Sequence, residues 1–322
     1  MKKGIFLICI TLLLIIGWSV GWFFVSGKVE TVLTDTKTKL AEKGKAFECT
    51  NQQVDGYPFR ISLNCDDIRY TDDSAGITFK AGQLKSAAQA YQPNKAIVEL
   101  QSPANLNLQN GEQFNTTWNS MRSSLKAGLS GPENISIHGK DINFLPTNNL
   151  EQAIDLKDFQ LHGRKIGDDN VNLALNLKGA SSPANLWPAF DLTSTFLIEN
   201  SYQDMIKRTG LLHVARTKGL KGKLEAFQYE PTNGGTLEIS GPAQVNTQGV
   251  LSGNFNIKIR NLPKLINALS KSFPQERDKF QDISGAISLL GNSGNEISIP
   301  ITVRNGKVSI GILPIASIPP LY

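Results

Sequence analysis

The chain of 322 residues contains few residues of the kinds that perform chemistry: three cysteines and three histidines. His138, His162 and His213 have no metal-ligand spacing to one another or to a cysteine, which argues against a metal site. No C-x-x-C pair is present, so the sequence does not predict a redox centre. We therefore expect neither a metal nor a cofactor.

The motifs of common enzymes are also missing. There is no P-loop, no G-x-G-x-x-G after a strand, no H-E-x-x-H and no G-x-S-x-G. His138 and His162 each precede a glycine at the end of an expected strand, which is more typical of a structural histidine than of a general base. Four closely spaced carboxylates are more typical of turns than of a catalytic pair: Asp66, Asp67, Asp72 and Asp73. The sequence predicts a protein that is not an enzyme.

Charge is absent from residues 5–25, "IFLICITLLLIIGWSVGWFFV". About 20 apolar residues are needed for a helix to cross a membrane, whereas the apolar region of a cleavable signal peptide has about 7–15. The run ends in Trp22, Phe23 and Phe24, which suit a membrane interface better than a cleavage site. We expect an uncleaved transmembrane anchor, with a signal peptide as the competing interpretation.

The two charges before the anchor are Lys2 and Lys3, so residues 1–4 are expected to be a cytoplasmic tip. The rest of the chain then lies outside the cytoplasm. Residues 26–45 have a thin apolar stripe at helical spacing and end near Gly44, which predicts a helical stalk.

Two of the three cysteines, Cys49 and Cys65, lie in the exported part, where an oxidising compartment favours a disulfide. Two unpaired buried thiols are the alternative, and Cys9 is an apolar residue of the anchor. Between the pair, "FECTN" and "FRISLNC" flank a turn, which predicts a stapled hairpin or a wide β-loop. We expect the turn to be a structural lip and not a ligand contact: Gly56, Tyr57, Pro58 and Phe59.

Residues 46–322 consist mostly of short alternating runs with Gly, Asn, Asp and Pro between them. Asn305-Gly306 is the strongest hairpin signal. Helices are expected at residues 201–212, 262–273 and 274–291, and a soft subdivision near residues 180–200, where Ser and Pro are frequent. The pattern predicts a mainly β (α+β) fold, a curved antiparallel β-meander with a few packed helices.

The sequence pI is about 9.0, yet export argues against nucleic acid as a partner. One stretch without acidic residues contains six basic ones that could contact anionic lipid: Lys207, Arg208, Arg216, Lys218, Lys221 and Lys223. A solvated face that maintains solubility is the favoured interpretation of the same residues.

The anchor, the cysteine pair around "GYPFR" and the closing "NGKVSIGILPIASIPPLY" resemble the DUF2125 family of uncharacterised, mainly alphaproteobacterial envelope proteins. "TWNSMRSSL" and "LKDFQLHGR" are further landmarks of the resemblance. More distantly, the layout is similar to AsmA-like periplasmic proteins, whose characterised members handle lipids between membranes or affect outer-membrane assembly. The resemblance implies a single-pass protein of the inner (cytoplasmic) membrane with its C-terminal domain in the periplasm.

Three functions are consistent with these features. The first is lipid binding, lipid transfer or envelope assembly, with a phospholipid or lipid A on an apolar concave face. The second is a non-catalytic scaffold that binds another envelope protein through a sheet edge. The third, an enzyme on envelope substrates, has the least support because no catalytic grouping is visible.

Overall fold

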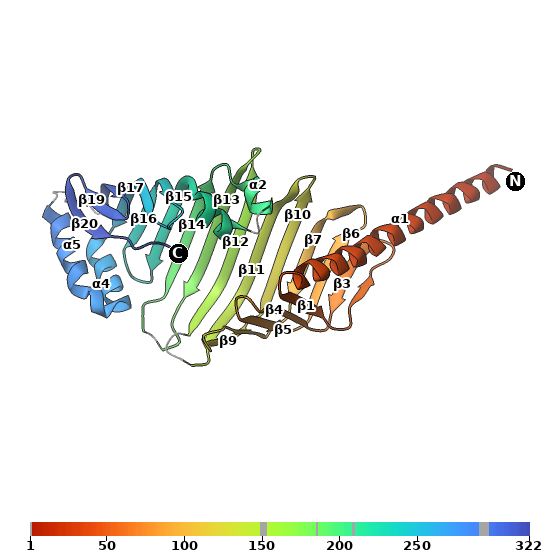
Figure 1. Ribbon diagram of the computed structural model, residues 1–322, viewed down its shortest axis with the longest axis horizontal. Coiled ribbons are helices and arrows are strands. Elements are labelled where there is room, and N and C mark those ends of the chain that lie inside the picture. Colours follow the sequence, from red (N-terminus) through yellow and green to blue (C-terminus); the bar gives the residue numbers. More distant parts are fainter. Residues whose placement is uncertain (1, 149–152, 185, 208–209, 290–295) are drawn as a thin grey trace. The chain divides into compact units, whose positions relative to one another are not determined.

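The computed structural model is mainly antiparallel β-sheet with one long N-terminal helix, as predicted (Figure 1). It describes residues 2–148, 153–184, 186–207, 210–289 and 296–322.

The chain forms two compact units. The first unit consists of residues 1–128 and 144–148, and the second of residues 129–143 and 149–322. The subdivision expected near residues 180–200 lies inside the second unit, because the loop there joins two strands that are hydrogen-bonded neighbours.

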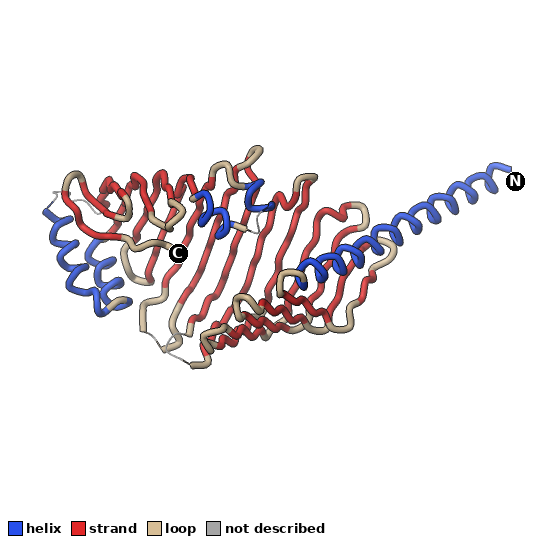
Figure 2. Tube along the Cα trace, viewed as in Figure 1, coloured by secondary structure: helices blue, strands red, loops and turns tan. Residues whose placement is uncertain are grey.

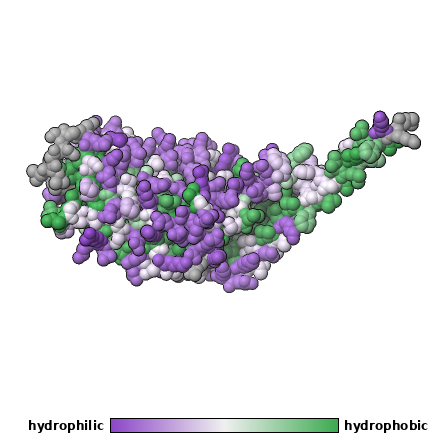
Figure 3. Space-filling view, turned by 90° about the horizontal axis from the view of Figure 1, so that it is seen from above, coloured by the Kyte–Doolittle hydropathy of each residue, from purple (hydrophilic) through white to green (hydrophobic). Residues whose placement is uncertain are grey.

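The first unit begins with α1 (Lys2–Ala41), a single helix that contains both the apolar run and the polar segment after it. The helix ends just before Gly44, whose φ of 68° is easily reached only without a side chain. In the polar half of α1, Lys37 Nζ donates to Gln52 Oε1 at 3.1 Å, so this part of the helix contacts the turn before β2. Figure 3 shows that the protruding part of α1 is mostly hydrophobic, with hydrophilic residues near its N-terminal tip.

The strands of the first unit form two antiparallel ladders. The first ladder runs in the order β2 (Gln53–Asp55), β3 (Arg60–Cys65), β6 (Leu84–Gln89), β7 (Gln92–Leu100) and β10 (Ser120–Gly128). The second ladder runs in the order β1 (Lys45–Cys49), β4 (Ile68–Asp72), β5 (Ile77–Ala81), β8 (Ala104–Asn107) and β9 (Gln113–Thr117). The chain passes from one ladder to the other through short turns, drawn in tan in Figure 2.

These turns stack beside one another along a boundary that we call the fold line, where the two ladders meet at an angle (Figure 1). Across it, Gly82 N donates to Pro103 O, and Trp118 Nε1 donates to Leu100 O. Buried side chains lie at or beside this line: Cys65, Ile68, Ala81, Ala104 and Trp118. Trp22 of α1 and Ile61 of β3 are also buried, so the core of the first unit includes the contact between α1 and β3 as well as the fold line.

The second unit is a meander in which consecutive strands pair antiparallel from β12 onward. Its strands are β11 (Gly131–Pro146, whose last residues belong to the first unit), β12 (Ile154–Ile166), β13 (Asn170–Ala180), β14 (Phe190–Ile198), β15 (Leu220–Pro231), β16 (Thr236–Val245), β17 (Leu251–Arg260), β18 (Glu296–Arg304), β19 (Lys307–Ile310) and β20 (Leu313–Ser317). The predicted Asn-Gly hairpin is present, with Arg304 opposite Lys307 and positive φ at Asn305 and Gly306.

Helices cover parts of this meander and close its core. They are α2 (Tyr202–Lys207), α3 (Leu211–Lys218), α4 (Leu262–Ser272), a 3-10 turn (Pro274–Glu276) and α5 (Arg277–Leu289). Leu262 and Leu265 of α4 and Ile287 of α5 pack with Ile259 and Ile299 of the strands. The single helix expected at residues 201–212 is two short helices, and the end expected for the last helix at Gly291 lies outside the described residues.

Candidate functional site

An apolar row runs across the second ladder of the first unit. The strand registers place Phe47 opposite Tyr70, Tyr70 opposite Phe79, Phe79 opposite Leu106, and Leu106 opposite Phe114. Side chains directly opposite in a ladder have Cβ atoms about 4.5–5.5 Å apart, so the five form one continuous strip. We call these five residues the inner row.

The position of the disulfide shows which way the inner row faces. Cys49 has the same strand parity as Phe47, and Cys65 has the same parity as Ile61 and Leu63. Since Cys49 and Cys65 are bonded, both of these faces point into the angle between the two ladders. Their other faces are exposed and mostly polar.

The inner row is only half-buried, although it is apolar. Each of its five side chains has intermediate exposure, whereas Cys65, Ile68, Ala81, Ala104 and Trp118 at the fold line are buried. Leu63, Ala88 and Val98 on the facing ladder are likewise half-buried. The inner faces of the two ladders therefore pack tightly only near the fold line. Away from the fold line, they leave apolar surface partly exposed.

The predicted disulfide is confirmed, but the hairpin around it is not. β1 pairs with β4 and not with β3, so "FECTN" and "FRISLNC" belong to different ladders. The short strand β2 is the hairpin partner of β3. The alternation of apolar and polar residues within each segment does not predict these pairings, because it shows which residues share a face but not which strand lies alongside. The disulfide consequently links the two ladders at the start of the fold line.

The turn between β2 and β3, Gly56–Phe59, contacts α1. We call it the GYPF loop. Trp18 Nε1 donates to Pro58 O at 2.9 Å, and Trp22 Nε1 donates to Arg60 O at 2.6 Å. The Tyr57 hydroxyl is 2.7 Å from Ser19 Oγ, and its ring lies against the rings of Trp22 and Phe23. The loop lies between two strands of the first ladder, and the structure adds that its side chains and carbonyls contact the apolar part of α1.

The acidic residues singled out in the sequence are structural in the arrangement observed. Asp72 is buried beside the inner row, accepts from Lys45 Nζ at 2.8 Å and from Ser74 Oγ at 2.6 Å, and has its pKa lowered to about 2, chiefly by the Lys45 hydrogen bond. Asp66 and Asp67 lie between β3 and β4, where they accept from Asn51 and Thr50. Asp73 donates its backbone N–H to Gly44 O.

Two of the histidines join neighbouring strands of the second unit. His138 Nε2 lies 2.7 Å from Asp158 Oδ2, and this hydrogen bond is the largest cause of a lowered Asp158 pKa. His162 Nδ1 lies 2.9 Å from Ser136 Oγ, and His213 is exposed on α3. Among the described residues, no group of three or more His, Cys, Asp or Glu side chains is placed to hold a metal ion.

The basic stretch of the second unit is partly neutralised by neighbouring acids. Lys218 pairs with Asp204, and Lys221 Nζ lies 3.6 Å from Glu199 Oε2. Arg208 lies outside the described residues, and Lys207 and Lys223 are exposed. The paired charges favour the solvated face over a lipid contact, and the lipid contact remains a prediction for Lys207, Arg208, Arg216, Lys218, Lys221 and Lys223.

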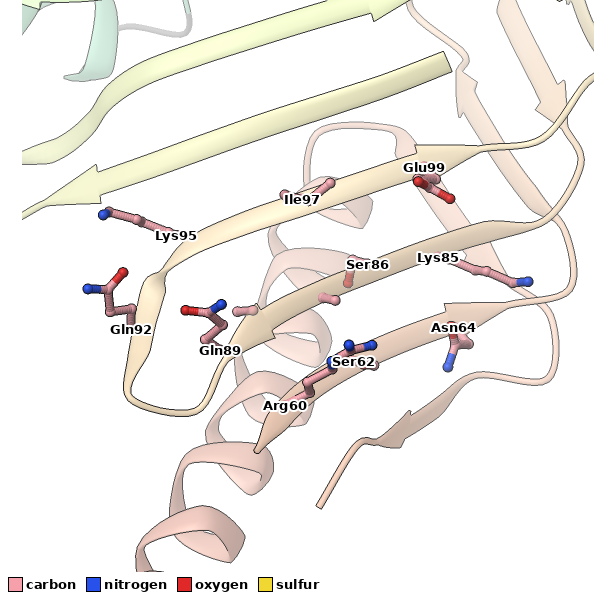
Figure 4. Close-up of a pocket in the computed structure, with 12 residues that line it drawn as sticks. Arg60, Ser62, Asn64, Lys85, Ser86, Gln89, Gln92, Lys95, Ile97 and Glu99 are labelled. Carbon is pink, nitrogen blue, oxygen red and sulfur yellow. The ribbon is translucent and has the colours of Figure 1, made fainter. Parts of the chain in front are cut away.

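The outer face of the first ladder has an open depression of about 630 Å³ (Figure 4). Polar and charged side chains supply most of its lining, including Arg60, Lys85, Gln89, Lys95 and Glu99. Apolar atoms nevertheless contribute most of its surface, because Ile97, two alanines and the carbon stems of the long side chains line it. The inner row differs from this depression in that it carries no charged side chain, and it is the candidate site of the first unit.

The second unit has a smaller strip of the same kind. The registers place Phe159 opposite Leu177 and Leu177 opposite Leu192, and all three are half-buried. None of the three belongs to the core that packs against α4 and α5. Half-buried apolar strips thus occur in each unit.

Together these features define a mainly antiparallel β protein with one N-terminal helix that is long and apolar enough to span a membrane. The model of DUF2125, a family described as an uncharacterised protein conserved in bacteria, matches residues 22–319. The chain therefore belongs to the DUF2125 family. No curated protein and no solved structure matches it, so the likeness to AsmA-like proteins remains an analogy of layout.

Proposed function

We propose that this protein is a lipid-binding protein of the bacterial envelope, anchored in the inner membrane by residues 5–25 with its body in the periplasm. The bound lipid is a phospholipid or lipid A, and one acyl chain lies along the inner row. The protein acts by binding or passing on lipid, or by supporting envelope assembly, and not by catalysis. The observation that carries the proposal is the half-buried inner row.

The dimensions of the inner row suit an acyl chain. Five strands have four gaps of about 4.8 Å between them, which gives a row roughly 19 Å long. A bilayer core of about 30 Å holds two opposed acyl layers, so one chain extends about 15 Å. The strip is long enough for one chain.

The cost of leaving the inner row in water also supports a ligand. Apolar surface gains about 25 cal/mol per Å² on burial, and each aromatic side chain carries about 150–250 Å². A chain laid on the row would bury the exposed remainder of three phenylalanines, Tyr70 and Leu106. No charged side chain belongs to the row, so the binding energy would come from apolar contact.

Two adjacent residues on β5 provide the test. Phe79 belongs to the inner row, while Lys80 points to the outer face and is exposed. A diazirine amino acid is placed at either position in the full chain, the cells are irradiated, and adducts are identified by mass spectrometry. We expect a phospholipid or lipid A adduct at Phe79 and none at Lys80. Equal yields at the two positions, or no lipid at Phe79, would contradict the proposal.

A scaffold is the second candidate, favoured by one observation in the second unit. β20 is hydrogen-bonded to β19 along one side, and all five of its residues are exposed. Edge strands of this kind can accept a strand from another protein. A protein partner lost on the substitution Ile315→Pro, together with an absence of lipid at Phe79, would favour this function.

A further inference from the structure

The contacts of α1 determine the depth of the GYPF loop. Trp18, Ser19 and Trp22 lie among the last eight residues of the apolar run that ends at Val25. At 1.5 Å per residue, Trp22 lies about 5 Å and Trp18 about 10 Å on the membrane side of Val25. Because Trp18 donates to Pro58 O in the loop and Trp22 donates to Arg60 O directly after it, the loop must lie at that level too.

The loop and its neighbour carry exposed aromatic side chains. Phe59 is 69% exposed and Tyr57 49% exposed. Ala90 N donates to Phe59 O, which holds the β6–β7 turn beside the loop, and Tyr91 in that turn is 62% exposed. Tyr and Trp are enriched where a membrane meets water, so these side chains suit a lipid environment.

A small cavity lies between α1 and β3 at the same level. Its volume is about 190 Å³, and it is lined by Gly17, Trp18, Gly21, Trp22, Ile61 and Ala90, together with Val25. The two glycines are four residues apart and therefore on one helix face. A Cβ built at either glycine would meet nothing within 4 Å, so missing side chains create the space.

Ile61 connects this cavity to the inner face of the first unit. It has the same strand parity as Leu63, whose side faces the angle between the ladders. The cavity therefore opens at membrane level on one side and borders the apolar inner face on the other. Arg60, next along β3, points to the outer face, where a long basic side chain can reach lipid phosphates.

We propose that the GYPF loop enters the outer half of the bilayer, and that the cavity between α1 and β3 admits an acyl chain from that leaflet. The occupant is a membrane phospholipid, because the cavity is bounded by the anchor helix itself. The inference rests on the proposed function, for which it supplies the point of entry, but its test does not depend on the inner row.

The test places a diazirine amino acid at Ala90 in the full chain, within native membranes. We expect a phospholipid adduct there. The substitution Gly21→Leu fills the cavity and should lower the adduct yield severalfold. Gly27→Leu is the matched control, since Gly27 lies on the same helix with open space around it. It should leave the yield unchanged.

A probe at Leu13, which is exposed in the middle of the apolar run, reports insertion of the anchor in every variant. Gly17→Leu approaches the cavity from its other end and serves as a second filling variant. An unlabelled Ala90 beside a labelled Leu13 would overturn the inference, as would a yield at Ala90 that neither filling variant lowers. An adduct at Ala90 that is sensitive to Gly21→Leu, without any adduct at Phe79, would retain the entry site and reject only the inner row.

Discussion

Loss of the Cys49–Cys65 disulfide should destabilise the first unit by about 3 kcal/mol. The two cysteines are 16 residues apart. In the chain-entropy model, a cross-link that closes a loop of about 15 residues constrains the unfolded chain by about 3 kcal/mol. The strands that carry the cysteines, β1 and β3, do not pair with each other, so the disulfide adds a cross-link between the two ladders beside the turns through which the backbone crosses.

The assay is thermal unfolding of the full chain in lipid nanodiscs, with and without reductant. For a domain of this size a loss of 3 kcal/mol corresponds to a melting temperature lower by roughly 10 °C. The double variant Cys49→Ala with Cys65→Ala should melt at the temperature of the reduced wild type and should not respond to reductant. Cys9→Ala is the control, because Cys9 is a free and exposed cysteine in the anchor.

A single Cys65→Ser variant should be less stable than the double alanine variant. Cys65 is 1% exposed, so a serine hydroxyl there is buried, and an unpaired buried hydroxyl costs about 1–3 kcal/mol. The reasoning would be refuted if mass spectrometry showed complete reduction of the wild type and its melting temperature did not change.

Two further predictions concern the same unit. The pKa of Asp72 is about 2 against 3.8 for an ordinary aspartate, so its ionised form stabilises the fold above pH 3.8 and this contribution disappears as the pH falls through 2. The melting temperatures of wild type and Asp72→Asn should therefore converge between pH 4 and pH 2, and a constant gap would contradict the assignment. Trp22→Phe removes the donor to Arg60 O at a cost of about 1 kcal/mol, and in detergent solution, where no bilayer covers the loop, trypsin should then cut after Arg60 faster than in wild type. Phe24→Leu, on an exposed part of α1, is the control, and equal cleavage rates in all three proteins would contradict a role for the indole.

Local patterns in the sequence were sufficient to predict most helices and strands, but not which strands pair with one another. The Asn305-Gly306 hairpin and the α4 helix were predictable because a turn type and a helical stripe are local signals. The inner row was not predictable from the sequence, because it depends on the pairing of β1 with β4 and of β5 with β8. In each of these pairs, strands of the other ladder lie between the two partners in the chain. Alternation shows which residues share a face and leaves the neighbouring strand undetermined.

The contact between α1 and the GYPF loop was also missed. The apolar run indicated a membrane span, and its aromatic end indicated an interface. Trp18 and Trp22 lie four residues apart and therefore share one helix face, which carries two indole hydrogen-bond donors. Gly17 and Gly21 have the same spacing, so the adjacent face lacks side chains at the same level of the helix. This spacing indicates that another segment packs against α1 at that level, but it does not identify the GYPF loop as that segment.

The order of the strands in the first unit has a consequence for its energetics. β1 pairs with β4, β3 with β6, β5 with β8 and β7 with β10, so every second strand is added beside one placed three elements earlier. The strands between them pair with their immediate predecessors. A structure built by this rule is quasi-one-dimensional, and its stability is approximately a sum of nearest-neighbour terms. A duplication or deletion of four consecutive strands, such as β4 to β7, would change the length of each ladder by two strands and keep the antiparallel order of both ladders. Relatives could therefore differ in strand number while keeping the same cross-section.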